Sequence, residues 1–125
     1  MSVIVNDAGF VADDWTGKVQ TLASDTDPAA MIGQLDDAAM ICVQFPSFAD
    51  GRGFTIARRL RLAGFKGRLR ARGHVIADQY AMARRAGFDD IEISDDLATR
   101  QPQDQWRART QWRAHDYQSR LRASV

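Results

Sequence analysis

Hydrophobic and polar positions follow one another along this chain in short blocks that predict strands and helices in turn. The longest apolar block covers residues 39–45, and only Gln44 interrupts it. A run that is hydrophobic on both faces is typical of a buried parallel strand. Pro46 ends the block, because proline has no N–H to donate to a strand ladder.

The sequence after this strand repeats a short pattern. Ala63-Gly64-Phe65 returns 23 residues later as Ala86-Gly87-Phe88, each time between a helical block and a strand-like block. A glycine just past a helix suits a left-handed cap, and parallel strands need helical crossovers of this length. We therefore predict two successive helix–strand units: helices over residues 55–63 and 76–86, and strands over residues 68–72 and 90–93.

The fold class that follows is α/β: a small β-α-β-α-β parallel sheet with an N-terminal hairpin and a C-terminal helix. The hairpin is predicted from two apolar stretches, residues 3–5 and 10–12, around a polar turn. The strand order is either sequential, like a fragment of a barrel, or flavodoxin-like, and the pattern does not choose between them. So small a sheet leaves edges exposed, which favours a homodimer.

Two further segments complete the organisation. Pro28 suits the first position of a helix over residues 28–35, with Asp27 as its N-cap. We expect residues 1–96 to form a single α/β domain and residues 97–125, which are rich in Gln and Arg, to form a helical tail. The tail has three interpretations: docking on its own domain through Trp106 and Tyr117, docking on a partner, or partial disorder.

Composition and charge limit the class of protein. The chain has 125 residues, 45% of them hydrophobic, and one cysteine, Cys42, for which a buried, inert thiol is expected. No apolar run reaches the roughly 20 residues of a membrane helix, and the N-terminus lacks a signal-peptide pattern, so we expect a cytoplasmic protein without membrane contact. Residues 1–51 carry one basic and eight acidic residues, and residues 52–125 carry sixteen and eight. Either the two halves pack together, or the basic half meets an anionic partner.

Candidate chemistry gathers where the parallel strands end, because open α/β sheets bind ligands beyond the carboxyl ends of their strands. The loop after residue 45 contains two glycines beside an acid and an arginine, which can bind an oxyanion through N–H groups and a guanidinium. The alternative is that Asp50 and Arg52 only stabilise this loop. The candidate ligand-binding residues are Gly51, Arg52, Gly53, Phe54 and Gln79, and the candidate catalytic residues are Asp50, His74 and Asp78.

The same stretch carries a family resemblance. Residues 45–61, with the series Phe-Pro-x-Phe-x-Asp-Gly-Arg-Gly-Phe-Thr, are followed by Gly67-x-Leu-Arg-Ala-x-Gly, by Asp78-Gln79 and by Arg85-x-Gly-Phe-Asp. Over residues 28–93 this order and spacing resembles the bacterial family known as domain of unknown function 934. The chain departs from the family pattern at His74, where an acidic residue is expected.

Members of that family are typically encoded beside assimilatory sulfite reductase, and some are described as probable oxidoreductases. The resemblance therefore implies a pathway and not a mechanism. The first hypothesis is an accessory protein that binds a small oxyanion, a sulfite reductase or another sulfur-assimilation enzyme. The alternative is a small enzyme acting on an anionic substrate. With one Cys and two His, we predict no metal site and no flavin or iron–sulfur cofactor. Nucleic-acid binding is disfavoured, because the arginines are scattered without a recognition module.

Overall fold

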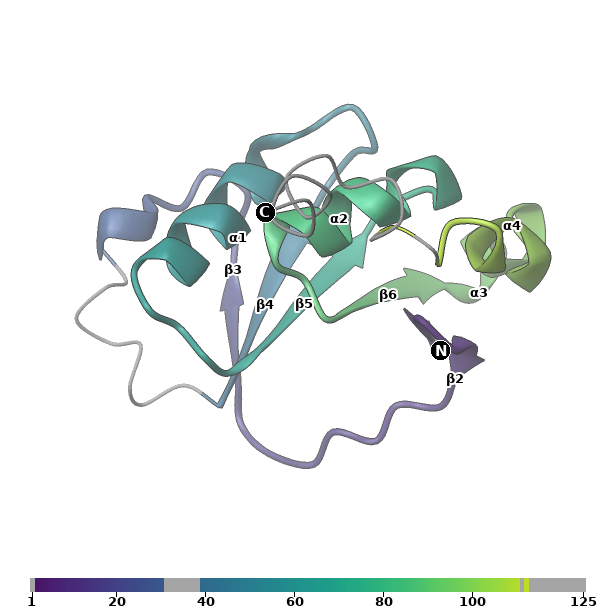
Figure 1. The fold of residues 1–125 in the computed structure, drawn as a ribbon, viewed down its shortest axis with the longest axis horizontal. Helices are drawn as coiled ribbons and strands as arrows, with labels where there is room; N and C mark the ends of the chain where they lie inside the picture. Colours follow the sequence, from purple (N-terminus) through teal and green to yellow (C-terminus); the bar gives the residue numbers. More distant parts are fainter. Residues whose placement is uncertain (1, 31–38, 111, 113–125) are drawn as a thin grey trace, which may run out of the picture.

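A six-stranded sheet, mostly parallel and covered by helices, is the architecture seen in a computed structural model of the chain (Figure 1). The structure describes residues 2–30, 39–110 and 112. It confirms the α/β class, and no helix in this part of the chain is long and apolar enough to cross a membrane. The strands are β1 (Ser2–Asn6), β2 (Gly9–Val11), β3 (Val19–Leu22), β4 (Met40–Phe45), β5 (Arg68–Gly73) and β6 (Asp90–Ser94). The helices are α1 (Arg52–Leu62), the 3-10 turn η2 (Ala77–Gln79), α2 (Tyr80–Ala86), α3 (Asp95–Arg100) and α4 (Gln103–Arg107).

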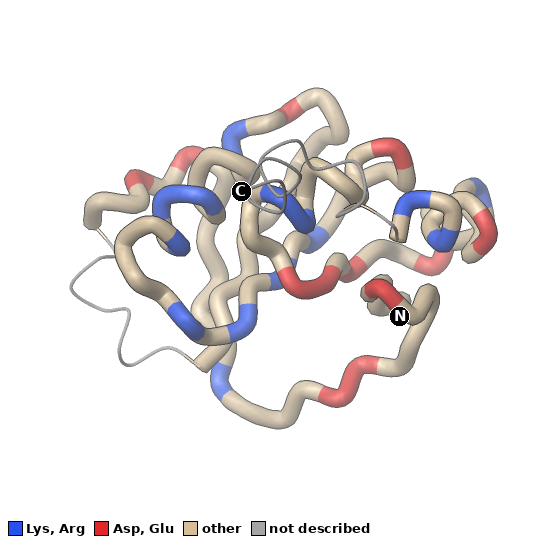
Figure 2. Tube along the Cα trace, in the orientation of Figure 1, with Lys and Arg blue, Asp and Glu red and all other residues tan. Residues whose placement is uncertain are grey.

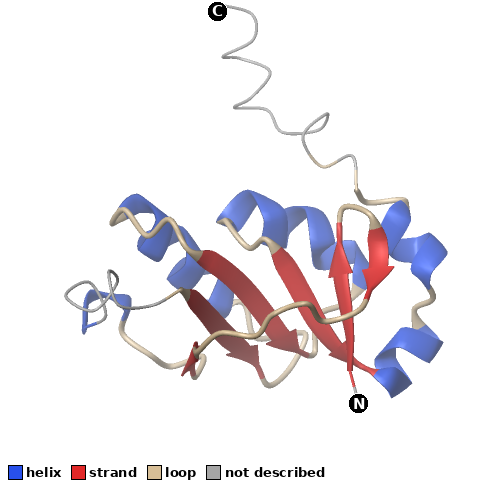
Figure 3. Cartoon of the chain, turned by 90° about the horizontal axis from the view of Figure 1, so that it is seen from below, coloured by secondary structure: helices blue, strands red, loops and turns tan. Residues whose placement is uncertain are grey.

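The strand order is β2-β1-β6-β5-β4-β3. Strands β3, β4, β5 and β6 are parallel and adjacent in sequence order, whereas β1 pairs antiparallel with both β6 and β2. Of the two strand orders that the sequence left open, the sequential one is therefore correct. Successive right-handed crossovers in one direction place their helices on the same face of a sheet, and Figure 3 shows α1 and α2 on one side.

The 23-residue repeat is a pair of matched helix ends. Gly64 and Gly87 adopt φ angles of 103° and 118°, and the phenylalanine after each donates its N–H back to the helix, Phe65 to Leu60 O and Phe88 to Ala83 O, both at 3.0 Å. This is the left-handed cap that the repeat predicted. The repeat extends to Arg61 and Arg84, each of which donates to the carbonyl of its own phenylalanine, at 3.0 and 2.5 Å.

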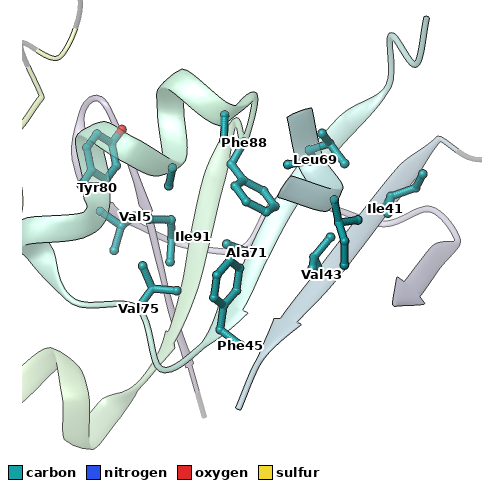
Figure 4. Close-up of a cluster of buried hydrophobic side chains, with 14 of the residues drawn as sticks. Val5, Ile41, Val43, Phe45, Leu69, Ala71, Val75, Tyr80, Phe88 and Ile91 are labelled. Atoms are coloured by element: carbon teal, nitrogen blue, oxygen red, sulfur yellow. The ribbon is translucent and has the colours of Figure 1, made fainter. Parts of the chain in front are cut away.

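Between the helices and the sheet lies a hydrophobic core that centres on aromatic rings (Figure 4). The Phe45 ring contacts those of Phe54 and Phe88, with centroids 5.0 and 5.8 Å away. Gly53 lets α1 approach this cluster, because a Cβ there would lie 2.4 Å from the tip of the Phe45 ring. Cys42, on the opposite face of β4, is fully buried as expected, and burial raises the pKa of its thiol.

The face of the sheet turned away from α1 and α2 carries a cluster of charges. Alternate residues of β5 place Arg68 and Arg70 on this face, next to Asp90 of β6, whose carboxylate is 1% exposed. Asp90 accepts hydrogen bonds from Arg68 at 3.0 and 2.6 Å and from Arg70 at 3.0 and 3.1 Å. Although burial acts to lower the pKa of Arg70, its hydrogen bonds to Asp90 raise that pKa overall.

The segment between β2 and β3 completes this face. It runs across the sheet (Figure 3), and its two carboxylates, Asp13 and Asp14, reach Arg70 and Arg68 at 3.2 and 3.1 Å. A further aspartate of the first half, Asp7 between β1 and β2, pairs with Arg84 of α2 at 3.1 Å. Figure 2 shows this acidic segment below the sheet. The uneven charge of the two halves thus reflects their packing together, one of the two interpretations of the sequence.

The structure differs from the predicted elements in places. The first helix begins at Arg52 instead of residue 55, and the second opens with the separate 3-10 turn η2. Strand β3 was not predicted, because Val19–Leu22 is short and half polar. Asp27 does cap the following turn, because its side chain accepts the Ala29 N–H at 3.0 Å. The rest of the helix predicted over residues 28–35 lies outside the described residues from residue 31 on.

Part of the predicted helical tail exists as α4, and Trp106 within it is fully buried against the core. Its indole N–H donates to Gln101 O at 2.8 Å, and its ring contacts that of Tyr80 edge-on. Tyr117, which the sequence placed on the same face as Trp106, lies outside the described residues.

The two repeat glycines make a matched pair for mutation. Each alanine substitution should cost about 1–2 kcal/mol for the left-handed backbone. At Gly87 the new Cβ would also lie 2.5 Å from Arg61 Cγ, whereas at Gly64 it would meet nothing within 4 Å. We expect Gly87→Ala to destabilise by about 1–3 kcal/mol more than Gly64→Ala, as measured by urea unfolding. Equal losses would contradict the packing of Arg61 against Gly87.

Asp90 should be the most sensitive charged position of the sheet. Asp90→Ala takes from Arg70, which is 3% exposed, its closest carboxylate and leaves only the longer contacts to Asp13 and Glu92. We expect a loss of about 3–5 kcal/mol in the free energy of unfolding. The neighbouring Glu92→Ala, which removes contacts of 3.4 and 3.6 Å to Arg70 and Arg72, should cost about 1 kcal/mol or less. A larger loss at Glu92 than at Asp90 would refute this assignment.

Candidate functional site

The loops at the carboxyl ends of β4 and β5 are joined by direct contacts. Gly73, with φ of 118°, brings the end of β5 to β4, and the His74 N–H donates to Phe45 O at 2.9 Å. Gln79 links the two loops, since its amide donates to Phe48 O at 2.7 Å while its oxygen accepts the Ile76 N–H at 3.0 Å. The sequence predicted that these loops would meet, and Gln79 is the side chain that holds them together.

Asp50 and Arg52 form a local clamp at the start of α1. The Asp50 carboxylate accepts from Arg52 Nε at 2.9 Å, from Nη2 at 2.8 Å, and from the Arg52 backbone N–H at 3.1 Å. These bonds hold the pKa of Asp50 well below its ordinary value, and raise that of Arg52. The alternative that Asp50 and Arg52 stabilise this loop is therefore supported, because a side-chain turn and an ion pair are both present.

The clamp nevertheless leaves part of the guanidinium open. The Arg52 side chain is 61% exposed, against 13% for Asp50. Its Nη2 also donates to Ser24 Oγ at 3.0 Å. Within the described part of the chain, Nη1 makes no hydrogen bond. Arg52 is thus held in a fixed orientation and keeps two N–H groups for another acceptor.

A cavity of 320 Å³ lies beside this arginine, between α1 and the segment after β3. Four residues of α1 at helical spacing form one wall, and hydroxyl groups of the facing segment contribute to the other. Arg59 has no ion pair among the residues that the structure describes. The lining residues are Ser24, Asp25, Thr26, Pro28, Arg52, Thr55, Ile56 and Arg59.

The other predicted ligand-binding residues of the loop lie in the first turn of the helix. Gly51 is the residue before α1, and Gly53 is buried against the Phe45 ring. The Phe54 N–H donates to Gly51 O at 3.2 Å, and the Phe54 ring belongs to the aromatic cluster. Each of these residues thus has a structural contact of its own.

The candidate catalytic residues are not joined to one another. Asp78 is exposed and pairs with Arg109 at 2.7 Å, while the side chain of His74 is exposed. Among the described residues, no hydrogen bond or ion pair connects Asp50 with either of them. No group of three or more His, Cys, Asp or Glu in this part of the chain could hold a metal ion.

Sequence analysis missed Ser24 and Arg59. Ser24 follows β3, which was not predicted, so no sequence signal placed its hydroxyl near the loop between β4 and α1. Arg59 lies seven positions after Arg52, a spacing that returns to the same face of a helix. Since α1 begins at Arg52 and not at residue 55, both arginines lie on this helix and on the same face of it.

The Asp50–Arg52 clamp can be tested by carboxyl titration. In the native protein Asp50 should remain ionised well below its ordinary pKa of 3.8. Because the Arg52 side chain is the largest cause of that shift, Arg52→Ala should return the pKa of Asp50 most of the way to this value. The measurement is a pH titration of the side-chain carboxyl carbon by NMR. An unchanged pKa in the variant would show that Arg52 does not hold Asp50.

A comparison with known families identifies the chain. A family model described as bacterial protein of unknown function (DUF934) matches residues 20–125. The match begins in β3 and includes the loop between β4 and α1, both repeat units, α3 and α4. No curated protein and no solved structure matches the chain. Since the matched region covers most of its length, this chain belongs to the DUF934 family of bacterial proteins of unknown function.

Proposed function

We propose that this protein is an accessory protein of assimilatory sulfite reduction, acting in the cytoplasm by binding a small oxyanion in the cavity beside Arg52. The pathway is the one that the family resemblance implies. The observation that carries the ligand class is the pairing of Arg52 and Arg59 around one cavity at the carboxyl end of the parallel strands. Ligands in open α/β sheets bind at this end.

The lining of the cavity suits a sulfur oxyanion. Such anions have several acceptor oxygens, which guanidinium and hydroxyl groups can contact from different sides. Arg52 offers its Nη1, and Arg59 offers a guanidinium without an internal partner in the described structure. Ser24, Thr26 and Thr55 add hydroxyl groups. Asp25, the one acid of the lining, opposes an anion and sets a limit on its affinity.

Binding is a better interpretation of this site than catalysis. A general base works best when its pKa lies near the operating pH. The Arg52 guanidinium lowers the pKa of Asp50, which makes its carboxylate a weaker base. His74 and Asp78 have no contact with Asp50 in the described structure. An enzyme acting on an anionic substrate, the second hypothesis of the sequence, therefore has less support.

A thermal-shift experiment tests the binding site. Dialysed protein is titrated with sulfite, sulfate and phosphate, and an oxyanion at 100 times its dissociation constant should stabilise the fold by about 2.7 kcal/mol. Arg52→Ala and Arg59→Ala should each remove most of this shift. The control is Arg58→Ala, on the same helix but outside the cavity, which should keep it.

Two results would count against the proposal. If no oxyanion stabilises the native protein, the cavity is not an anion site. If Arg52→Ala lowers the melting temperature but leaves a ligand-induced shift intact, the clamp is only structural. The pathway has a separate readout: a strain carrying Arg52→Ala should grow poorly with sulfate and normally with cysteine as its sulfur source.

A further inference from the structure

The outer surface of α1 and α2 is basic and partly hydrophobic. The two helices contain six arginines and no acidic residue. Between them lies a groove of 310 Å³, formed by Phe54, Thr55, Arg58, Met82, Arg85 and Ala86. This groove is separate from the oxyanion cavity, although Thr55 of α1 lines both.

Large hydrophobic side chains are exposed along this helical layer. Met82 in the groove is 54% exposed, and Leu62 at the end of α1 is also exposed. Phe48, in the loop between β4 and α1, is also exposed, and its backbone carbonyl accepts a hydrogen bond from Gln79. An exposed methionine in a groove with arginines in its lining is typical of an interaction surface.

We propose that the groove between α1 and α2 is a docking surface for an acidic amphipathic segment of another protein. The large apolar side chains of that segment would pack against Met82 and Phe54. Its carboxylates would pair with Arg58 and Arg85 at the rim. This is a helix-in-groove or extended-peptide mode of recognition, in which apolar anchors supply affinity and charge supplies orientation.

Charge complementarity indicates that the partner segment is negatively charged. Arg58 has no ion pair within the described residues, and Arg85 donates only to the backbone carbonyl of Trp112, at 3.1 Å. No carboxylate of the two helices competes with an incoming one. An acidic segment can therefore form new ion pairs here without first breaking old ones.

The same argument disfavours the other occupants. The rest of the chain after Trp112 contains three arginines and one aspartate, so its charge has the same sign as the groove. In a second copy, Asp7, Asp13, Asp14 and Asp50 are already engaged by arginines of their own chain. Its helices α3 and α4, whose first turns are acidic, pack their large apolar side chains, Leu97 and Trp106, against their own core. An acidic segment of a different protein fits best.

The test uses two synthetic peptides with the same apolar face. One carries leucine and phenylalanine at helical spacing with glutamate at its other positions, and its twin carries lysine in place of every glutamate. We expect the full-length protein to bind the glutamate peptide about tenfold or more tightly than the lysine peptide, as measured by fluorescence anisotropy. Binding should weaken as salt is added, because the rim charges are screened.

Matched variants locate the surface. Met82→Glu and Arg58→Glu should each weaken binding of the glutamate peptide about tenfold, and amide NMR shifts should change along α1 and α2. Arg59→Glu is the control, because Arg59 faces the oxyanion cavity and not the groove. Unchanged NMR spectra away from each substitution confirm that the variants are folded.

Several outcomes would overturn the proposal. They are equal binding of the two peptides, equal weakening by Arg59→Glu and Arg58→Glu, and peptide-induced shifts away from α1 and α2. Self-association that Met82→Glu abolishes would assign the surface to a second copy of the chain instead. The result is independent of the oxyanion site, since Arg58→Glu should leave the oxyanion-induced thermal shift in place.

Discussion

The buried carboxylate of Asp90 is the interaction on which the sheet depends. Two arginines of β5 donate four hydrogen bonds to it, and those arginines in turn hold the segment that crosses the sheet through Asp13 and Asp14. A charge taken out of water is costly unless it is fully paired. Here the buried charges of Asp90 and Arg70 compensate each other and join β5 to β6, and the more exposed Asp13 and Asp14 attach the crossing segment to them.

This network follows from the sequential order of the parallel strands. Because α1 and α2 both lie on one face, they leave the other face uncovered. The sheet closes that face with ion pairs to a loop instead of with a second hydrophobic layer. Asp13 and Asp14 of the first half are used there, whereas Arg58 and Arg59 on the helical side have no ion pair within the described residues. The two surfaces of the molecule consequently differ in charge, although the net charge is only +1.

The sequence predicted the features that depend on local pattern and failed where tertiary contacts decide. The repeated Ala-Gly-Phe marked both helix ends, because a left-handed cap requires glycine. The apolar block marked β4. Strand β3 has no such pattern and exists because it pairs with β4. Gly53 stays a candidate binding residue, and its contact with Phe45 is an additional packing requirement that only the folded structure reveals.

The candidate site shows the same division. Asp50 and Arg52 are two residues apart, so their clamp could be foreseen, but the cavity beside them also needs Ser24 and Arg59 from outside the loop. With Nε and Nη2 of Arg52 occupied by Asp50 and Ser24, an anion meets the guanidinium from one side only. Its affinity must then depend as much on Arg59 and the hydroxyl groups as on Arg52. Such a site favours exchange of the oxyanion that we propose over its permanent retention.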